Sequence, residues 1–189
     1  MKRYFILLIF CIFVSEIQAQ RQSDSWALQG SFGIMGRSGN FLNNDMATQY
    51  TFGGTRMLGS YFVEANVFMQ DFGVKHYQLQ NHIPFRVYGI NALGGWSYEG
   101  WFPVMFNFKA GGLAGYQFVN KESDRDSEFN TKLSNEIKGF TYSVVGSIEG
   151  ELNLVHGLNF TLAYNQYYYP TNKWIRWQFA ANAGLKYYF

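Results

Sequence analysis

Three features are scarce in this chain of 189 residues: cysteine, proline and charge. It has one cysteine, Cys11, and three prolines, and charged residues make up only 15% of it. The net charge is +2 and Lys and Arg form no cluster, so we expect no direct nucleic-acid binding. After the first 19 residues there is also no apolar run of the roughly 20 residues that a transmembrane helix needs.

The N-terminus has the pattern of an export signal. Lys2 and Arg3 precede the apolar run 4–14, and a polar stretch then ends in the small residue Ala19. We predict cleavage between Ala19 and Gln20. This divides the chain into a signal peptide, 1–19, and a single domain, 20–189.

Two other interpretations of the N-terminus are less favoured. A membrane anchor would need a longer apolar run than this one. Lipidation at Cys11 would need a small residue before it, whereas Phe10 stands there. The mature domain then contains no cysteine, so a secreted domain must be stabilised by its own architecture rather than by disulfides.

Aromatic residues are abundant, at 20%, while the mean hydropathy is only −0.17. That combination is expected when lipid-facing and lumen-facing residues alternate along strands. Eight segments alternate in this way, at residues 25–34, 49–58, 61–70, 83–89, 104–110, 140–152, 158–165 and from 174 to the end. Arg56 is the one charge on the apolar side of these segments. In the fourth segment we assign Phe85 and Val87 to the lipid side and Arg86 to the lumen.

The lengths of the connections also alternate. Short turns are predicted at 58–60 and 155–157, with a longer glycine-rich turn at Gly94–Gly100. Long polar connections are predicted at 35–46, 71–81, 120–137 and 169–173. Long loops on the outside and short turns in the periplasm are typical of outer-membrane barrels. The sequence therefore predicts an all-β fold, an eight-stranded antiparallel up-and-down transmembrane β-barrel. A soluble lipocalin-like barrel is the alternative.

The last strand carries a further pattern. Asn182, Gly184, Tyr187 and Phe189 have the spacing of the signal that the barrel-insertion machinery reads, with an aromatic residue at the end of the chain. We therefore expect outer-membrane lipid and the insertion machinery among the partners of this chain.

Charged residues on the predicted inward faces are expected to form a structural polar network in the lumen. They are Glu64, Arg86, Lys109, Glu149, Glu151, Arg176 and Lys186. Side chains just fill the interior of an eight-stranded barrel, and buried charges must be paired. The alternative is a path for protons or a substrate.

Catalysis is not expected. His76 and Asp71 share the second long connection and His82 lies at its far end, as a lipid-modifying enzyme would require, but no motif surrounds them. His156 lies in a turn on the opposite side. No metal or cofactor site is predicted. The charge-rich connection 120–137 is the segment we expect to contact a partner, because loops on a rigid scaffold carry recognition.

Several stretches resemble the conjugative-transposon TraO family. They are Gly111–Asn120, the Ile83-Pro84 pair with Gly89, the Glu149–Leu154 stretch and Gly184-Leu185-Lys186. The resemblance implies a non-enzymatic outer-membrane component of a conjugative DNA-transfer apparatus similar to type IV secretion, with other transfer proteins as partners. It implies no catalytic residues. A lipid-modifying barrel enzyme and a general structural or adhesion barrel remain the alternatives.

Overall fold

Eight long strands account for most of the chain in the computed structural model, which describes residues 24–36, 47–75, 82–120, 138–172 and 176–189. The strands are β1 (Trp26–Gly36), β2 (Ala47–Leu58), β3 (Tyr61–Lys75), β4 (His82–Trp101), β5 (Val104–Val119), β6 (Lys138–Val155), β7 (Leu158–Tyr168) and β8 (Trp177–Tyr188).

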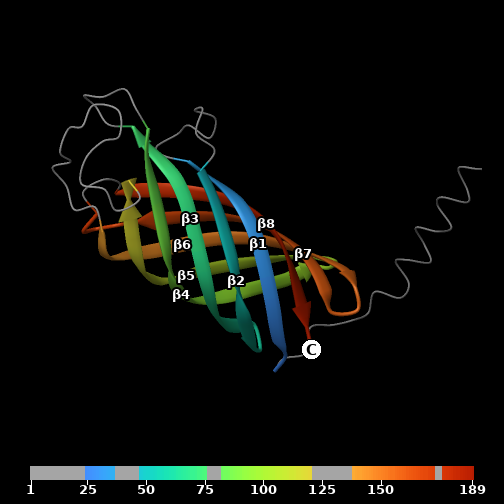
Figure 1. Ribbon diagram of the computed structural model, residues 1–189. Coiled ribbons are helices and arrows are strands. Elements are labelled where there is room, and N and C mark those ends of the chain that lie inside the picture. Colours follow the sequence, from blue (N-terminus) through green and yellow to red (C-terminus); the bar gives the residue numbers. More distant parts are fainter. Residues whose placement is uncertain (1–23, 37–46, 76–81, 121–137, 173–175) are drawn as a thin grey trace, which may run out of the picture.

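The strands form one closed barrel. Each pairs antiparallel with the next along the chain, and β1 pairs with β8 (Figure 1). At the closure, Trp26 and Phe189 exchange backbone hydrogen bonds of 3.1 and 2.9 Å. Because closure leaves no unpaired edge, every strand can satisfy its backbone groups without water. The prediction of an eight-stranded antiparallel barrel is confirmed.

The stagger of the strands follows from their register. One row of paired residues runs through Trp26, Arg56, Val63, Gly94, Ala110, Gly146, Gln166, Phe179 and Gly36. The row leaves β1 at Trp26 and returns to it at Gly36, ten residues further on. A stagger of this size in eight strands requires a tilt of roughly 40° to the barrel axis. Residues in one row therefore climb steadily along the barrel.

Three turns of two residues each join strands at one end, which we call the short-turn end. They occupy 59–60, 102–103 and 156–157. Gly59 and Gly157 have φ of 68° and 73°, which only glycine adopts without strain. The turn expected at Gly94–Gly100 is wrong, because β4 continues through these residues to Trp101. The opposite, long-connection end is where β1, β3, β5 and β7 finish.

Along each strand, side chains point alternately to the outer surface of the barrel and into its lumen. Phe52 and Phe140 are 60% and 70% exposed, whereas Glu64 and Glu151 on the other face are 4% and 0% exposed. At these positions charge lies inside and large apolar groups lie outside. Such an arrangement is stable only when hydrocarbon surrounds the barrel.

The faces that we assigned to the fourth segment are reversed. Phe85 and Val87 are 0% and 1% exposed in the lumen, while Tyr88 is 42% exposed on the outer surface. The reason is that both faces of β4 are apolar near this end, so hydrophobicity alone does not distinguish them. Arg86 consequently lies outside.

Candidate functional site

Five charged side chains meet in the lumen, toward the short-turn end. Lys109 lies 3.1 Å from Glu64 and 2.7 Å from Glu149. Lys186 lies 2.7 Å from the other oxygen of Glu149 and 3.4 Å from Glu151. Acid and base thus alternate in one continuous chain across the barrel. Opposite neighbours compensate the cost of removing each charge from water.

Amide side chains occupy the remaining hydrogen-bonding positions of the carboxylates. Asn107 Nδ2 donates to both Glu149 and Glu151 at 2.8 Å. Asn159 donates to the second oxygen of Glu151. Asn66 donates to Glu64 at 2.7 Å. The carboxylates are therefore held as hydrogen-bond acceptors, and none is placed as a free nucleophile or base.

This lumen network contains at least one side chain from every strand. In strand order these are Gln29, Thr55, Glu64, Asn91, Lys109, Glu149, Asn159 and Lys186. A network with contacts on all sides braces the barrel across its diameter, and hydrogen bonds in such a low-dielectric interior reinforce one another.

A small cavity lies beside the lumen network. Its volume is about 40 Å³, and Ser31, Asn91, Lys109 and Asn182 are among the residues that line it. The side-chain oxygen of Asn182 has no hydrogen-bond partner. Each water needs roughly 10–15 Å³ of such volume and a few polar partners, so the cavity suits about three waters. It is far too small for a solute path.

The lumen near the long-connection end holds apolar side chains together with buried uncharged polar ones such as Gln49, Gln70 and Gln117. One cluster of buried side chains fills it, made of Met35, Phe68, Phe72, Phe85, Val87, Leu93, Leu113, Val119, Val145, Tyr167, Tyr169 and Ala180. The rings of Phe72 and Phe85 stack with centroids 4.6 Å apart. This apolar cluster fills the lumen at the long-connection end with closely packed side chains, as the core of a soluble protein does.

The chain just after β7 folds inward and covers the apolar cluster. The Tyr169 hydroxyl donates to Gln70 at 2.9 Å, and Asn172 donates to Gln117 at 3.0 Å. Sequence analysis missed both residues because they lie in a connection, where no strand periodicity indicates which side chains point inward. Side chains of this segment consequently lie across the lumen at this end.

Of the seven charged residues predicted for the lumen, the structure brings together Glu64, Lys109, Glu149, Glu151 and Lys186. Arg86 and Arg176 do not belong to this group, because both are exposed. Arg86 lies on the outer surface of β4, where it pairs with Asp71. Arg176 precedes β8 at the rim of the barrel, where an arginine side chain can stay in contact with water.

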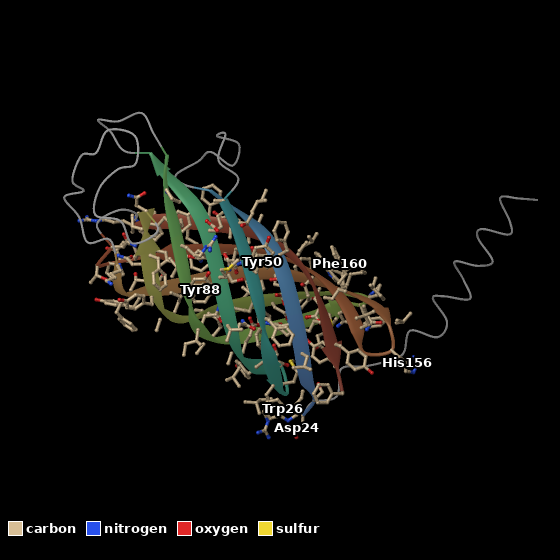
Figure 2. The ribbon with its side chains drawn as sticks, viewed as in Figure 1. Asp24, Trp26, Tyr50, Tyr88, His156 and Phe160 are labelled. Carbon is tan, nitrogen blue, oxygen red and sulfur yellow. The ribbon has the colours of Figure 1, made fainter. Side chains whose placement is uncertain are left out.

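Of the residues considered for an enzyme, the structure describes the side chains of Asp71 and His156, and these lie at opposite ends of the barrel. Asp71 accepts two hydrogen bonds from Arg86 on the outer surface. His156 lies in a turn at the short-turn end (Figure 2). His76 lies outside the described residues. In the described ranges, no three His, Cys, Asp or Glu side chains could hold a metal ion together.

Exposed aromatic residues cluster near both ends of the barrel. At the short-turn end they include Trp26, Tyr61, Tyr98, Trp101, Tyr187 and Phe189, and at the other end Tyr88, Tyr116, Phe140, Tyr142, Tyr168 and Trp177. Figure 2 shows Trp26 at the short-turn end and Tyr88 farther up the barrel. Aromatic girdles on either side of an apolar band are typical of barrels in the outer membrane.

Arg56 is the exception that the sequence indicated on the apolar face. It lies at the short-turn end of β2, where its guanidinium packs 5.2 Å from the ring centroid of Trp26. A long side chain near the interface can reach the headgroups while its stem remains in the apolar layer. Within the described ranges, no helix is long and apolar enough to cross a membrane.

Two predictions fall outside the described residues. They are the signal peptide with its cleavage between Ala19 and Gln20, and the charged connection at residues 121–137. The insertion signal Asn182, Gly184, Tyr187 and Phe189 lies within and just after β8, and its role stays a prediction.

The fold matches known outer-membrane barrels. The crystal structure of Neisserial surface protein A covers 89% of this chain and 98% of its own, at 13% identity and a TM-score of 0.54. The crystal structure of OprG from Pseudomonas aeruginosa covers 89% of this chain and 97% of its own, at 13% identity and a TM-score of 0.53. The crystal structure of Ail, the attachment invasion locus protein of Yersinia pestis, covers 88% of this chain and 97% of its own, at 12% identity and a TM-score of 0.53. No family model and no curated protein matches the chain.

Closure, stagger, outward apolar band and these matches together define the class. The chain is an eight-stranded transmembrane β-barrel of the outer membrane. At such low identity the matches establish the fold alone. What this barrel does must therefore be argued from its own surfaces and lumen.

Proposed function

We propose that this protein is a non-enzymatic outer-membrane barrel that acts through its outer surface and not through its lumen. The lumen network carries this proposal, because it joins all eight strands and the cavity beside it measures about 40 Å³. A rigid, filled barrel is suited to holding external loops in fixed positions. Adhesion or contact with a neighbouring cell is the function class that this arrangement favours.

Fold-level analogy supports the same class. The attachment invasion locus protein is named for attachment, and it shares this fold at 12% identity. The connection at residues 121–137 has the highest density of charge of both signs in the mature chain. We propose it as the contact segment.

Conductance and cell contact test the proposal separately. The full mature protein, reconstituted in planar bilayers, is expected to show no stepwise conductance. A variant lacking Lys121 to Asn135 should fold and reach the membrane, yet bind less to the target cell or surface. Stepwise conductance by the wild-type protein would overturn the proposal. Undiminished binding by the loop variant would remove this segment from it.

Conjugative transfer is a narrower hypothesis, and it rests on the TraO resemblance alone. The comparisons lend it no support. Packing also accounts for part of the resemblance: a Cβ at Gly111 would lie 2.1 Å from the Ala92 carbonyl oxygen, and one at Gly115 would lie 2.6 Å from that of Tyr88. An in-frame deletion tests the hypothesis through mating frequency at unchanged donor growth. Normal transfer would dismiss it.

We also propose that the aromatic ring of Phe189 guides insertion. Phe189→Ala keeps the backbone hydrogen bonds to Trp26, whereas deletion removes them. Both variants should be exported normally and accumulate less in folded, heat-modifiable form. If only the deletion lowers the folded amount, barrel closure rather than recognition of the ring explains the effect.

A further inference from the structure

The buried charges of the lumen network do not sum to zero. Among the described residues, the charged side chains that are buried are Glu64, Lys109, Glu149, Glu151 and Lys186. Three carboxylates and two ammonium groups leave a net charge of −1. Each of them has hydrogen-bond partners, but a hydrogen bond does not cancel a charge. Because hydrocarbon surrounds the barrel, a buried excess charge is costly unless a positive charge balances it.

The cavity of about 40 Å³ lies against these charges, and Glu64 and Glu149 both line it. An ionised carboxylate has about four lone-pair positions. The Glu64 carboxylate accepts one hydrogen bond from Asn66 at 2.7 Å and one from Lys109 at 3.1 Å, so it has positions left for a further partner. Lys109 lines the cavity too, and Glu64 and Glu149 on either side compensate its charge.

Three hydroxyl groups line the same cavity, those of Ser31, Thr51 and Thr161. They follow one row of paired residues, with Gly184 between Ser31 and Thr161. A Cβ at Gly184 would lie 2.7 Å from that of Ser31, so only a residue without a side chain lets this hydroxyl row stay closely spaced. Each hydroxyl oxygen carries two lone pairs, so the row can serve as a set of neutral oxygen ligands.

A buried amide oxygen without a partner belongs to the cavity wall as well. The Asn182 side chain is 6% exposed and lines the cavity, and its Oδ1 accepts no hydrogen bond from the described residues. The oxygen lies over Gly33, where a Cβ would collide with it. An amide oxygen is only an acceptor, so it needs a donor or a cation. The unsatisfied oxygen and the net negative charge are therefore met by the same kind of ligand.

We propose that this cavity binds one monovalent metal cation, with oxygens of Glu64, Asn182 and the hydroxyl row as its ligands. One such ion brings the net charge of the buried groups to zero. Hard cations take oxygen ligands, and a bare sodium or potassium ion is no larger than one of the roughly three waters that the cavity suits. A divalent ion would exceed the charge to be balanced, and in the described ranges no three His, Cys, Asp or Glu side chains could hold one. The ion stabilises the barrel whatever the outer surface contacts.

Exchange of the cation at constant ionic strength tests the proposal. Full mature protein is folded in zwitterionic vesicles, and its unfolding in urea is compared in sodium or potassium chloride and in N-methylglucamine chloride, whose cation is much larger than the cavity. Equal ionic strength keeps the screening of surface charges the same. Since the ion binds the folded barrel, the unfolding equilibrium constant should fall about tenfold when the small cation is present at ten times its dissociation constant. Equal stability in all three salts would overturn the proposal.

Glu64→Gln removes the excess charge and should abolish the dependence on the small cation, whatever its own effect on stability. The matched control is Asp71→Asn, which removes a carboxylate on the outer surface and should keep the full dependence. Crystals of the wild-type protein grown in rubidium chloride should show an anomalous-scattering peak in the cavity, a measurement that needs no variant. Dependence that survives in Glu64→Gln or disappears in Asp71→Asn, a cavity without the peak, or uptake of a proton on folding in place of the cation would each contradict the proposal.

Discussion

The two halves of the lumen differ in whether they contain charge. Toward the short turns, charged and amide side chains form the lumen network, with Glu149 between two lysines. Toward the long connections, the apolar cluster fills the same width with rings such as Phe72 and Phe85. One half holds the buried charges and their pairing, and the other combines apolar packing with hydrogen bonds between uncharged groups. A barrel of constant strand number therefore accepts either filling, provided that no charge is left unpaired and no void remains.

The largest effect is expected from Glu149→Gln in the polar half. It leaves Lys109 and Lys186 without the carboxylate that joins them. Breaking a buried ion pair by removing one partner costs about 3–5 kcal/mol. Equilibrium unfolding of the barrel in urea measures the loss. Asp24→Asn, which changes an exposed carboxylate, should stay within about 0.5 kcal/mol. A similar small change at Glu149 would mean that the network contributes no stability.

Phe85→Ala in the apolar half should cost about 3 kcal/mol, because it leaves a cavity beside Phe72. The same unfolding assay applies. Ile90→Ala is the comparison on the lipid face of the same strand, where Ile90 is 62% exposed. Acyl chains can fill the space that it vacates, so its effect should be clearly smaller. Equal losses would indicate that the apolar cluster is not packed as a core.

Tyr169→Phe addresses the covering of the apolar half. It removes the hydrogen bond to Gln70 and keeps the ring, so the expected loss is about 1 kcal/mol. A decrease in protection from hydrogen exchange should accompany it near residues 169–172 and not at β6. Uniform loss of protection across the barrel would contradict a local role for this contact.

The smallest effect is expected from Asp71→Asn, outside the lumen. The Arg86–Asp71 pair has side chains 49% and 35% exposed, and exposed pairs contribute under about 1 kcal/mol. Raising the salt concentration should reduce the difference from wild type further. A loss as large as that of Glu149→Gln would show that surface pairing matters as much as the network.

The polar half of the lumen could be predicted from the sequence, and the apolar half could not. Glu64, Lys109 and Glu149 follow the alternation of their strands, and a charge on one face identifies the lumen. Around Phe85 both faces are apolar, and the one charge, Arg86, is tolerated outside because it sits at the rim beside Asp71. In this region the alternation separates the two faces of the strand but does not show which face contacts lipid.

The predictions from sequence also fail at turns and connections. Glycine is frequent in β4, so Gly94–Gly100 has the composition of a turn, yet Gly94 lies in the open on the outer face, where a Cβ would meet nothing within 4 Å. The actual turn, at 102–103, follows two aromatic residues of the short-turn girdle. Tyr169 and Asn172 contact residues far away in sequence, so only the assembled barrel reveals their role.

The hydrogen bonds between Trp26 and Phe189 join the two ends of the described chain. The contacts that complete the structure are therefore the most distant ones in sequence, and their entropic cost must be met before they contribute. Until β8 is in place, β1 and β7 each present a bare edge that could pair with another chain. A nascent or truncated form is thus an aggregation hazard rather than a smaller barrel, and β1 must stay sheltered until the last residues of the chain have arrived.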